Sequence, residues 1–86
     1  MTKKSVEIKL QNGLEARPVA VLVQVASKYD SRIYLESKGK KVNAKSIMGM
    51  MGLGLDNGET VTVTAEGQDE TRAVEDIELF LNGALA

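Results

Sequence analysis

The sequence predicts an α+β fold in which a four-stranded antiparallel sheet carries three helices on one face. Alternating polar and apolar residues indicate half-buried strands, one of them followed by a short hairpin partner. Segments with helical apolar spacing or helix-start signals lie between the strands. The resulting order is β-α-β-β-α-β-α, and strands with one apolar face favour an antiparallel sheet covered by helices on one side.

The length of 86 residues suits one domain, which we place over 1–86. The hydrophobic fraction of 43% fits a globular fold. The chain contains neither cysteine nor histidine, so a transition-metal site would have almost no ligands. We therefore expect no metal and no cofactor.

The first strand is expected over 5–10, followed by a turn at Asn12-Gly13. A helix is expected over 17–28, with Pro18 in its first turn, where a missing N–H group costs little. The apolar positions of the strand share one face: Val6, Ile8 and Leu10. The helix carries a main apolar stripe of Val19, Leu22, Val23 and Ala26, with Ala20, Val21 and Val25 outside it.

A second strand is expected over 31–37, with Ile33 and Leu35 facing inward. Lys38-Gly39 then forms a tight turn into a short strand that runs through Val42, which makes this pair a hairpin. Ser46 begins a short helix over 47–51 that is diluted by glycines.

The last strand is expected over 60–65, after the turn signal Asp56-Asn57-Gly58. Asp69 is a favourable N-cap for the final helix, and Gly83 is a plausible residue to end it. That helix is expected to bury its apolar residues Ala73, Val74, Ile77, Phe80 and Leu81.

Charge is divided unevenly: residues 1–45 carry a net charge of +6 and residues 46–86 carry −7. The positive charge concentrates at Lys38, Lys40, Lys41 and Lys45, and the negative charge suggests one solvated helix face at Asp69, Glu70, Glu75, Asp76 and Glu78. Aromatic residues make up only 3%, so we expect no direct nucleic acid contact. The longest apolar run, 19–23, cannot span a bilayer, and we expect a soluble cytoplasmic protein with no membrane contact.

The window Gly13-Leu14-Glu15-Ala16-Arg17-Pro18 resembles the signature Gly-x-His-Ala-Arg-Pro of the HPr family, the small phosphocarriers of the bacterial sugar phosphotransferase system. The resemblance covers essentially the whole chain and implies the open-faced β-sandwich of that family. In the family the histidine carries the phosphoryl group, whereas this chain has Glu15 there and no histidine elsewhere. The resemblance therefore implies that phosphoryl transfer through histidine is lost.

A second segment, Lys45-Ser46-Ile47-Met48-Gly49, resembles HPr of Gram-positive bacteria. The serine at this place is phosphorylated there by the ATP-dependent HPr kinase/phosphorylase. A phosphate at a helix start is favoured beside its free N–H groups. The alternative is that Ser46 serves only as an N-cap.

The resemblance also implies a docking face at the starts of the first two helices. An apolar surface wider than one stripe often meets a partner, and flexible methionines suit such a surface, although they also fill cores. The candidate partner-binding residues are Arg17, Ala20, Gln24, Lys40, Lys41, Lys45, Ile47, Met48 and Met51.

Within the family, the chain resembles the catabolite repression HPr-like proteins, which lack the histidine but keep the serine. This implies a non-enzymatic regulator that is phosphorylated on Ser46 and then binds the LacI-type regulator catabolite control protein A as corepressor. The alternatives are a serine-phosphorylated effector of a metabolic enzyme and a phosphotransferase-system phosphocarrier homologue. Glu15 is either a neutral replacement or a fixed charge that partly imitates phosphohistidine. The terminal first strand could also exchange between protomers, so a homodimer is possible.

Overall fold

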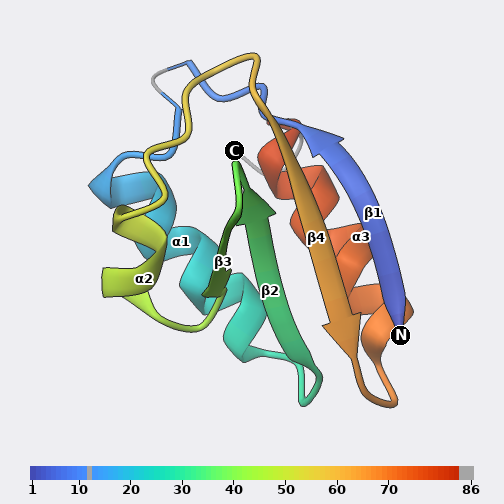
Figure 1. Cartoon of the computed structure of the whole chain (residues 1–86). Helices are drawn as coiled ribbons and strands as arrows, with labels where there is room; N and C mark the ends of the chain where they lie inside the picture. Colours follow the sequence, from blue (N-terminus) through green and yellow to red (C-terminus); the bar gives the residue numbers. More distant parts are fainter. Residues whose placement is uncertain (12, 84–86) are drawn as a thin grey trace.

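The computed structural model describes residues 1–11 and 13–83, so Asn12 of the predicted Asn12-Gly13 turn lies outside the described residues. The elements appear in the predicted order (Figure 1). They are β1 (Thr2–Glu7), α1 (Ala16–Ser27), β2 (Arg32–Ser37), β3 (Lys40–Asn43), α2 (Ile47–Met51), β4 (Thr60–Glu66) and α3 (Glu70–Leu81).

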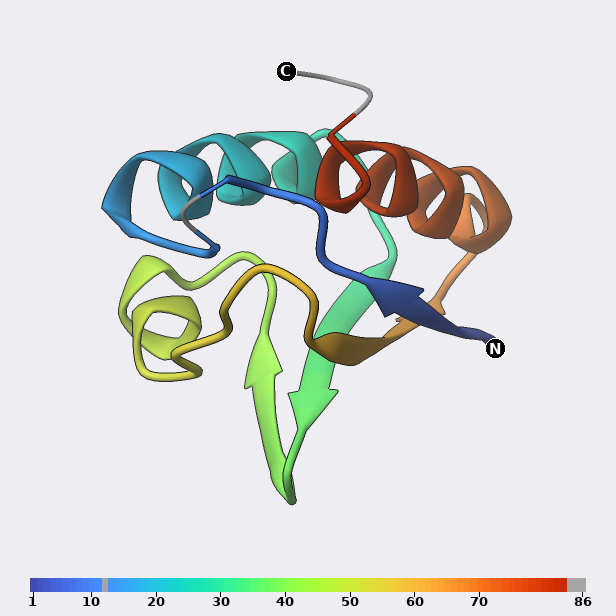
Figure 2. The ribbon, with the colours of Figure 1, turned by 90° about the horizontal axis from the view of Figure 1, so that it is seen from above.

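The four strands form one sheet in the order β1-β4-β2-β3, and every pairing is antiparallel. Helices α1 and α3 lie side by side on one face of this sheet, and α2 lies next to α1 near the edge strand β3 (Figure 2). No helix of the described residues covers the other face of the sheet (Figure 2), which confirms the open-faced α+β architecture. No helix within the described residues is long and apolar enough to cross a membrane.

The core lies between the sheet and the helices, as the apolar periodicities predicted. Val63 of β4 is fully buried and pairs with Leu35 of β2, which is also fully buried. From the helices, Leu22 and Ile77 have no exposed surface. Each such side chain contributes about 1.5–3 kcal/mol through its burial. All five apolar residues predicted for the buried face of α3 are buried.

Strand β1 lies earlier in the chain than the predicted range 5–10. Val6 and Ile8 are buried as expected, but the ladder with β4 ends at Glu7. Beyond it, the Ile8 N–H donates to the Glu59 carbonyl at 2.8 Å, and the Lys9 N–H donates to the Leu81 carbonyl at 2.7 Å. The chain therefore leaves the sheet to bind the end of α3, which the local alternation could not reveal.

The buried stripe of α1 differs from the predicted one at two positions. Val25 was expected outside the stripe but is buried, whereas Val23 is only partly buried. The reason is that α1 contacts both α2 and α3, so its buried surface extends around the helix.

The predicted hairpin of β2 and β3 is confirmed, with Ser37 opposite Lys40 and a two-residue turn between them. The turn residues Lys38 and Gly39 have φ angles of 52° and 80°. Two positive φ angles fit the right-handed twist of the flanking strands, which explains glycine at the second turn position.

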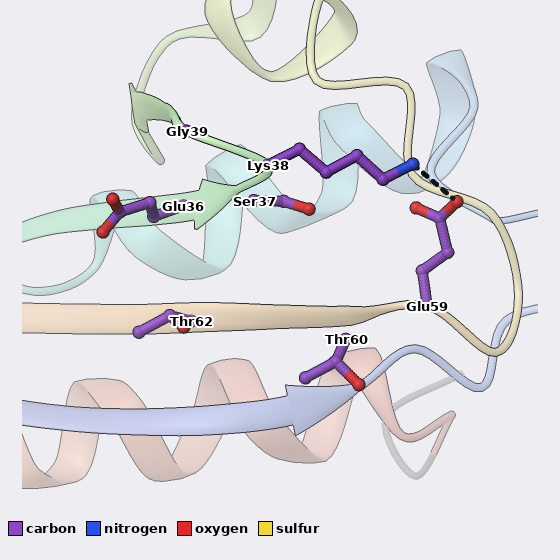
Figure 3. A pocket seen from close by; sticks show the side chains of 7 residues that line it. All are labelled: Glu36, Ser37, Lys38, Gly39, Glu59, Thr60 and Thr62. Carbon is purple, nitrogen blue, oxygen red and sulfur yellow. Dashed lines mark hydrogen bonds and ion pairs between the residues drawn. The ribbon is translucent and has the colours of Figure 1, made fainter.

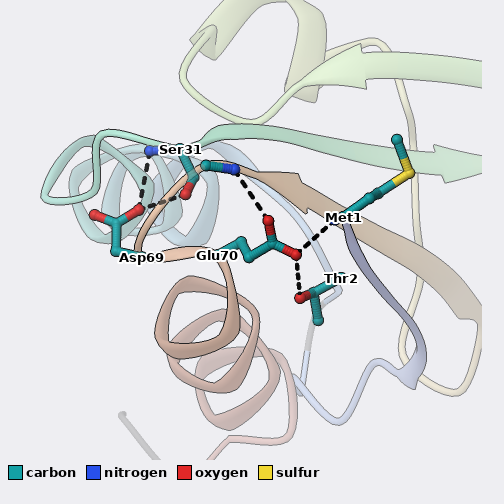
Figure 4. Close-up of polar contacts among 6 residues, drawn as sticks. Met1, Thr2, Ser31, Asp69 and Glu70 are labelled. Carbon is teal, nitrogen blue, oxygen red and sulfur yellow. Dashed lines mark hydrogen bonds and ion pairs between the residues drawn. The ribbon is translucent and has the colours of Figure 1, made fainter.

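Asp69 occupies the N-cap position of α3, but within the described chain its side chain makes no capping hydrogen bond. Instead, the carboxylate accepts the backbone N–H group of Asp30 at 2.9 Å. It also accepts the N–H group of Ser31 at 3.0 Å and the Ser31 hydroxyl (Figure 4). The Ser31 hydroxyl is the main cause that lowers the pKa of Asp69. Asp69 thus joins the start of α3 to the loop before β2.

The prediction of one solvated acidic face on α3 was wrong, because Asp69 and three further carboxylates of the predicted set contact other parts of the chain. Glu70 accepts the Thr2 hydroxyl at 2.6 Å and the N-terminal ammonium at 2.8 Å (Figure 4). Glu78 accepts the Lys4 ammonium at 2.8 Å. Asp76 accepts the Tyr29 hydroxyl, which connects α3 to the end of α1.

Candidate functional site

The signature window places Glu15 at the N-cap of α1 and Arg17 in its first turn. Both side chains are exposed, and they line a hollow of about 430 Å³ together with Leu10, Gln11, Gly13 and Pro18. A carboxylate at this helix end is favoured by the helix dipole, although the Glu15 side chain forms no capping hydrogen bond within the described chain.

Gly13 holds this window against the loop that precedes β4. Its φ of 70° favours glycine, and a Cβ atom here would lie 2.5 Å from the Leu55 carbonyl oxygen. The next residue, Leu14, donates its N–H to that same carbonyl at 2.8 Å and is buried. The glycine of the signature is thus required by the packing of two loops.

Glu15 and Arg17 do not neutralise one another. Among the described residues, ion pairs join the N-terminus, Lys4 and Lys38 to carboxylates, and none involves Glu15 or Arg17. Arg17 is thus an exposed cation without an ion pair among the residues that the structure describes.

Ser46 is the N-cap of α2, as the sequence predicted. Its hydroxyl oxygen accepts the Gly49 N–H at 3.2 Å, and its carbonyl accepts the Met50 N–H at 3.0 Å. A Cβ atom on Gly49 would lie 3.4 Å from the Ser46 hydroxyl oxygen, so glycine leaves the space around that oxygen open. The side chain is partly exposed, which a modifying enzyme requires.

Asn43 shapes the turn that delivers Ser46 and was missed as a site residue. Its side-chain oxygen accepts the Lys45 N–H at 2.8 Å, and its carbonyl accepts the Ser46 N–H at 3.0 Å. When an Asn side-chain oxygen accepts the backbone N–H two residues later, the segment is an Asx turn. Asn at the end of a predicted strand, three residues before the serine, was the signal that could have found it.

Three side chains of α2 that were predicted as partner contacts are exposed. The exposed fractions are 51% for Ile47, 88% for Met48 and 47% for Met51, whereas Met50 is fully buried. Met50 therefore fixes α2 in the core while its neighbours face outward.

The neighbouring face of α1 extends this apolar area, because α1 and α2 pack against each other. Gln24 is exposed and Ala20 is partly exposed. Val21, which was not predicted as a contact, is 37% exposed. We call Ala20, Gln24, Ile47, Met48 and Met51 the α1–α2 surface.

The structure does not gather the four lysines into one basic cluster. Lys38 reaches across from its turn to Glu59 at 3.4 Å (Figure 3). The Lys41 ammonium lies 4.8 Å from the centre of the Tyr34 ring. Lys40 and Lys41 are both exposed, but successive residues of a strand point to opposite faces.

The ammonium of Lys45 is held within the chain, although Lys45 was predicted as a partner contact. It donates to the Tyr29 carbonyl at 2.6 Å, and the residue is only partly exposed. A cation near the end of α1 is favoured by the helix dipole. The side chain of Lys45 thus links the start of α2 to the end of α1.

A second hollow, of about 520 Å³, lies at the β2–β3 turn and the start of β4 (Figure 3). Charged and hydroxyl-bearing residues and one glycine line it, and none of them is a predicted site residue. Among the described residues, no group of three or more His, Cys, Asp or Glu side chains could hold a metal ion.

The family model described as the PTS HPr component phosphorylation site matches residues 2–83. A relative, the HPr-like protein Crh of Halalkalibacterium halodurans, is 51% identical over 81 residues, which cover 94% of this chain and 96% of the relative.

Solved structures agree with this match. The phosphocarrier protein HPr of Bacillus anthracis superposes with a TM-score of 0.91 at 44% identity, covering 93% of this chain and 95% of that one. Crh of Bacillus subtilis, described as a dimer with a swapped domain, has a TM-score of 0.79 at 46% identity and covers 96% and 95% of the two chains. The chain belongs to the HPr family.

Proposed function

We propose that this chain is an HPr-like regulatory protein of carbon catabolite repression in the cytoplasm. HPr kinase/phosphorylase phosphorylates Ser46, and the phosphorylated form binds catabolite control protein A as corepressor. The observation that carries this proposal is the position of Ser46, whose partly exposed hydroxyl caps α2 directly beside the exposed Ile47 and Met48.

Phosphorylation suits this position without a change of fold. A phosphate adds a charge of about −1.5 to −2, and the free N–H groups of a helix start favour an anion. The backbone around Ser46 is already held by Asn43 and by the bond to Met50. The modification therefore changes the charge of the surface rather than its shape.

Docking combines one charged and one apolar component in this proposal. The phosphate and the exposed Arg17 provide the charged groups, and the α1–α2 surface provides the apolar ones. The exposed Lys40 and Lys41 act at the periphery. Lys45 contributes through its internal bond to Tyr29, which supports the start of α2.

The proposed function does not include phosphoryl transfer through position 15, because Glu15 stands where the family has its histidine. A carboxylate cannot act as an imidazole relay at neutral pH. A stable phosphoryl adduct after incubation with phosphoenolpyruvate and the upstream phosphotransferase enzyme would instead support the phosphocarrier alternative.

We also propose that the chain can form a homodimer by exchange of β1, as the swapped Crh relative of Bacillus subtilis suggests. β1 is an edge strand and contacts α3 through Thr2 and Lys4. The same contacts could form with a second copy. Light scattering on the purified protein tests this: two species that interconvert on dilution are expected, and a monomer at all concentrations excludes exchange.

The decisive experiment for the proposed function is incubation with HPr kinase/phosphorylase and ATP, followed by mass spectrometry and a binding assay with catabolite control protein A. One phosphoryl group on Ser46 and binding that depends on it are expected. Ser46→Ala should remove both, whereas Ser37→Ala, a matched control in β2, should keep both. Equal binding by modified and unmodified protein would show that Ser46 is not the switch. Phosphorylated protein that captures a metabolic enzyme instead would favour the effector alternative.

A further inference from the structure

We propose that Met48 and Met51 are peroxide-sensitive modification sites whose oxidation disables the α1–α2 surface. The inference rests on the proposed function, because that function makes the surface a docking site. Its basis is the way in which the fold distributes the methionines of the chain.

The chain has four methionines, and three of them lie in α2. Met48 is 88% exposed and Met51 is 47% exposed, whereas Met50 has no exposed surface. Because peroxide attack follows exposure, the same five-residue helix holds two reactive sulfurs and one protected sulfur. The reactive ones are those that the proposal assigns to docking.

The fourth methionine provides an internal comparison. Met1 is 77% exposed and precedes β1, which is the edge strand opposite to β3. α2 packs near β3, so Met1 lies at the other side of the sheet (Figure 1). Its oxidation should proceed without affecting the α1–α2 surface.

The chemical step is a transfer of one oxygen atom from hydrogen peroxide to the thioether sulfur. The O–O bond breaks, an S=O bond forms, and the remaining oxygen leaves as water. The sulfur is oxidised by two electrons and the peroxide is reduced by the same two. The product is methionine sulfoxide, which methionine sulfoxide reductases convert back to methionine.

The consequence for binding follows from the polarity of the sulfoxide. A docked partner would bury an oxygen that needs a hydrogen bond, on an area that otherwise presents apolar atoms. The fold should survive, because the sulfur of Met50 is shielded in the core. Oxidation would thus remove docking even when Ser46 carries phosphate.

The experiment treats Ser46-phosphorylated protein with hydrogen peroxide, maps the sulfoxides by peptide mass spectrometry and measures affinity for catabolite control protein A. We expect fast oxidation of Met1, Met48 and Met51, slow oxidation of Met50, an unchanged circular dichroism spectrum and affinity that falls about tenfold or more. The double variant Met48→Leu/Met51→Leu lacks both reactive sulfurs, so the affinity that this variant has before peroxide should be the same after peroxide, while Met1 is still oxidised. Met50→Leu is the matched control and should remain sensitive.

Several results would overturn the inference. These are equal affinity before and after oxidation of Met48 and Met51, loss of affinity in the double Leu variant after peroxide, and oxidation of Met50 as fast as Met48. Each of them leaves the proposed function intact. If the unoxidised phosphorylated protein does not bind the regulator, the proposed function is wrong, and the proposed effect of methionine oxidation is wrong with it.

Discussion

The hydroxyl oxygen of Ser46 lies 3.2 Å from the backbone nitrogen of Gly49 and accepts its hydrogen bond. One atom therefore caps α2 and is also the proposed acceptor of phosphate. Ser46→Ala should lower the free energy of unfolding by about 1 kcal/mol, whereas Ser46→Asp, which restores a capping oxygen, should recover most of that loss. Urea unfolding of the three proteins measures both values. Equal stability of Ser46→Ala and the parent would show that the cap contributes nothing.

Glu15 lies exposed at the start of α1 and forms no ion pair with Arg17 among the described residues. If it is a neutral replacement, Glu15→Gln should leave the affinity of the Ser46-phosphorylated protein for catabolite control protein A within about twofold. Arg17→Gln should weaken that affinity about tenfold, because it removes a charge-assisted contact to phosphate. Isothermal titration of both variants provides the comparison. A marked change with Glu15→Gln would identify a fixed charge that tunes the surface.

Gly13 and Gly39 both have positive φ angles, but only Gly13 meets another segment at close range. Gly39→Ala should lower the free energy of unfolding by about 1 kcal/mol, the cost of a left-handed residue. Gly13→Ala should lower it by at least about 2 kcal/mol, because its Cβ also meets the Leu55 carbonyl. Chemical denaturation tests the difference. Similar losses for the two variants would mean that the loops can move apart at no cost.

Glu70 should make stability depend on pH in acid. The N-terminal ammonium, followed by the Thr2 hydroxyl, lowers the pKa of its carboxyl from 4.5 to about 2. Because the folded chain has the lower pKa, this contribution is present above about pH 4.5 and is lost as the pH falls toward 2. Glu70→Gln should therefore destabilise the protein near neutral pH and differ less from the parent in acid. Urea unfolding across this range is the measurement, with Glu75→Gln as the exposed control on α3. If the free energies of unfolding of Glu70→Gln and the parent differed by the same amount at every pH, this would contradict the contact between Glu70 and the N-terminal ammonium.

Tyr29 should ionise only in strong alkali. The hydrogen bond to Asp76, with burial second, raises its pKa from 10.0 to about 12. The folded chain has the higher pKa, so this contribution holds below pH 10 and is lost as the pH rises through about 12. Ultraviolet titration should show a tyrosinate that forms near pH 12 in the parent and in Tyr34→Phe but is missing in Tyr29→Phe. If the signal near pH 12 persisted in Tyr29→Phe, it would not come from Tyr29.

Local patterns in the sequence predicted most of the fold. The alternation around Val63 and the helical spacing around Leu22 identified residues that are fully buried. The Lys38-Gly39 turn followed from backbone preferences that act over two residues. The cap at Ser46 lies within one helical turn, and it was predicted for the same reason.

Such local patterns could not predict contacts between segments that are distant in the sequence. Asp69 looked like an N-cap, but its carboxylate binds Ser31, which is 38 residues earlier in the chain. Lys45 looked like a free surface cation, but it binds the carbonyl of Tyr29. A long side chain can reach several partners, and only the packing of elements determines which partner is near.

The sequence by itself determined the order of the elements, the buried faces, the family signature and the absence of a histidine, because these depend on residue identity and short-range periodicity. Only the tertiary structure decided which partners the charged side chains contact and which side chains are exposed. It joined α3 to β1 through Glu78 and Lys4, dispersed the lysines, and selected Met50 as the methionine of α2 that is buried. The physical reason is that periodicity depends on a few neighbouring residues, whereas charge pairing and exposure depend on which elements pack together.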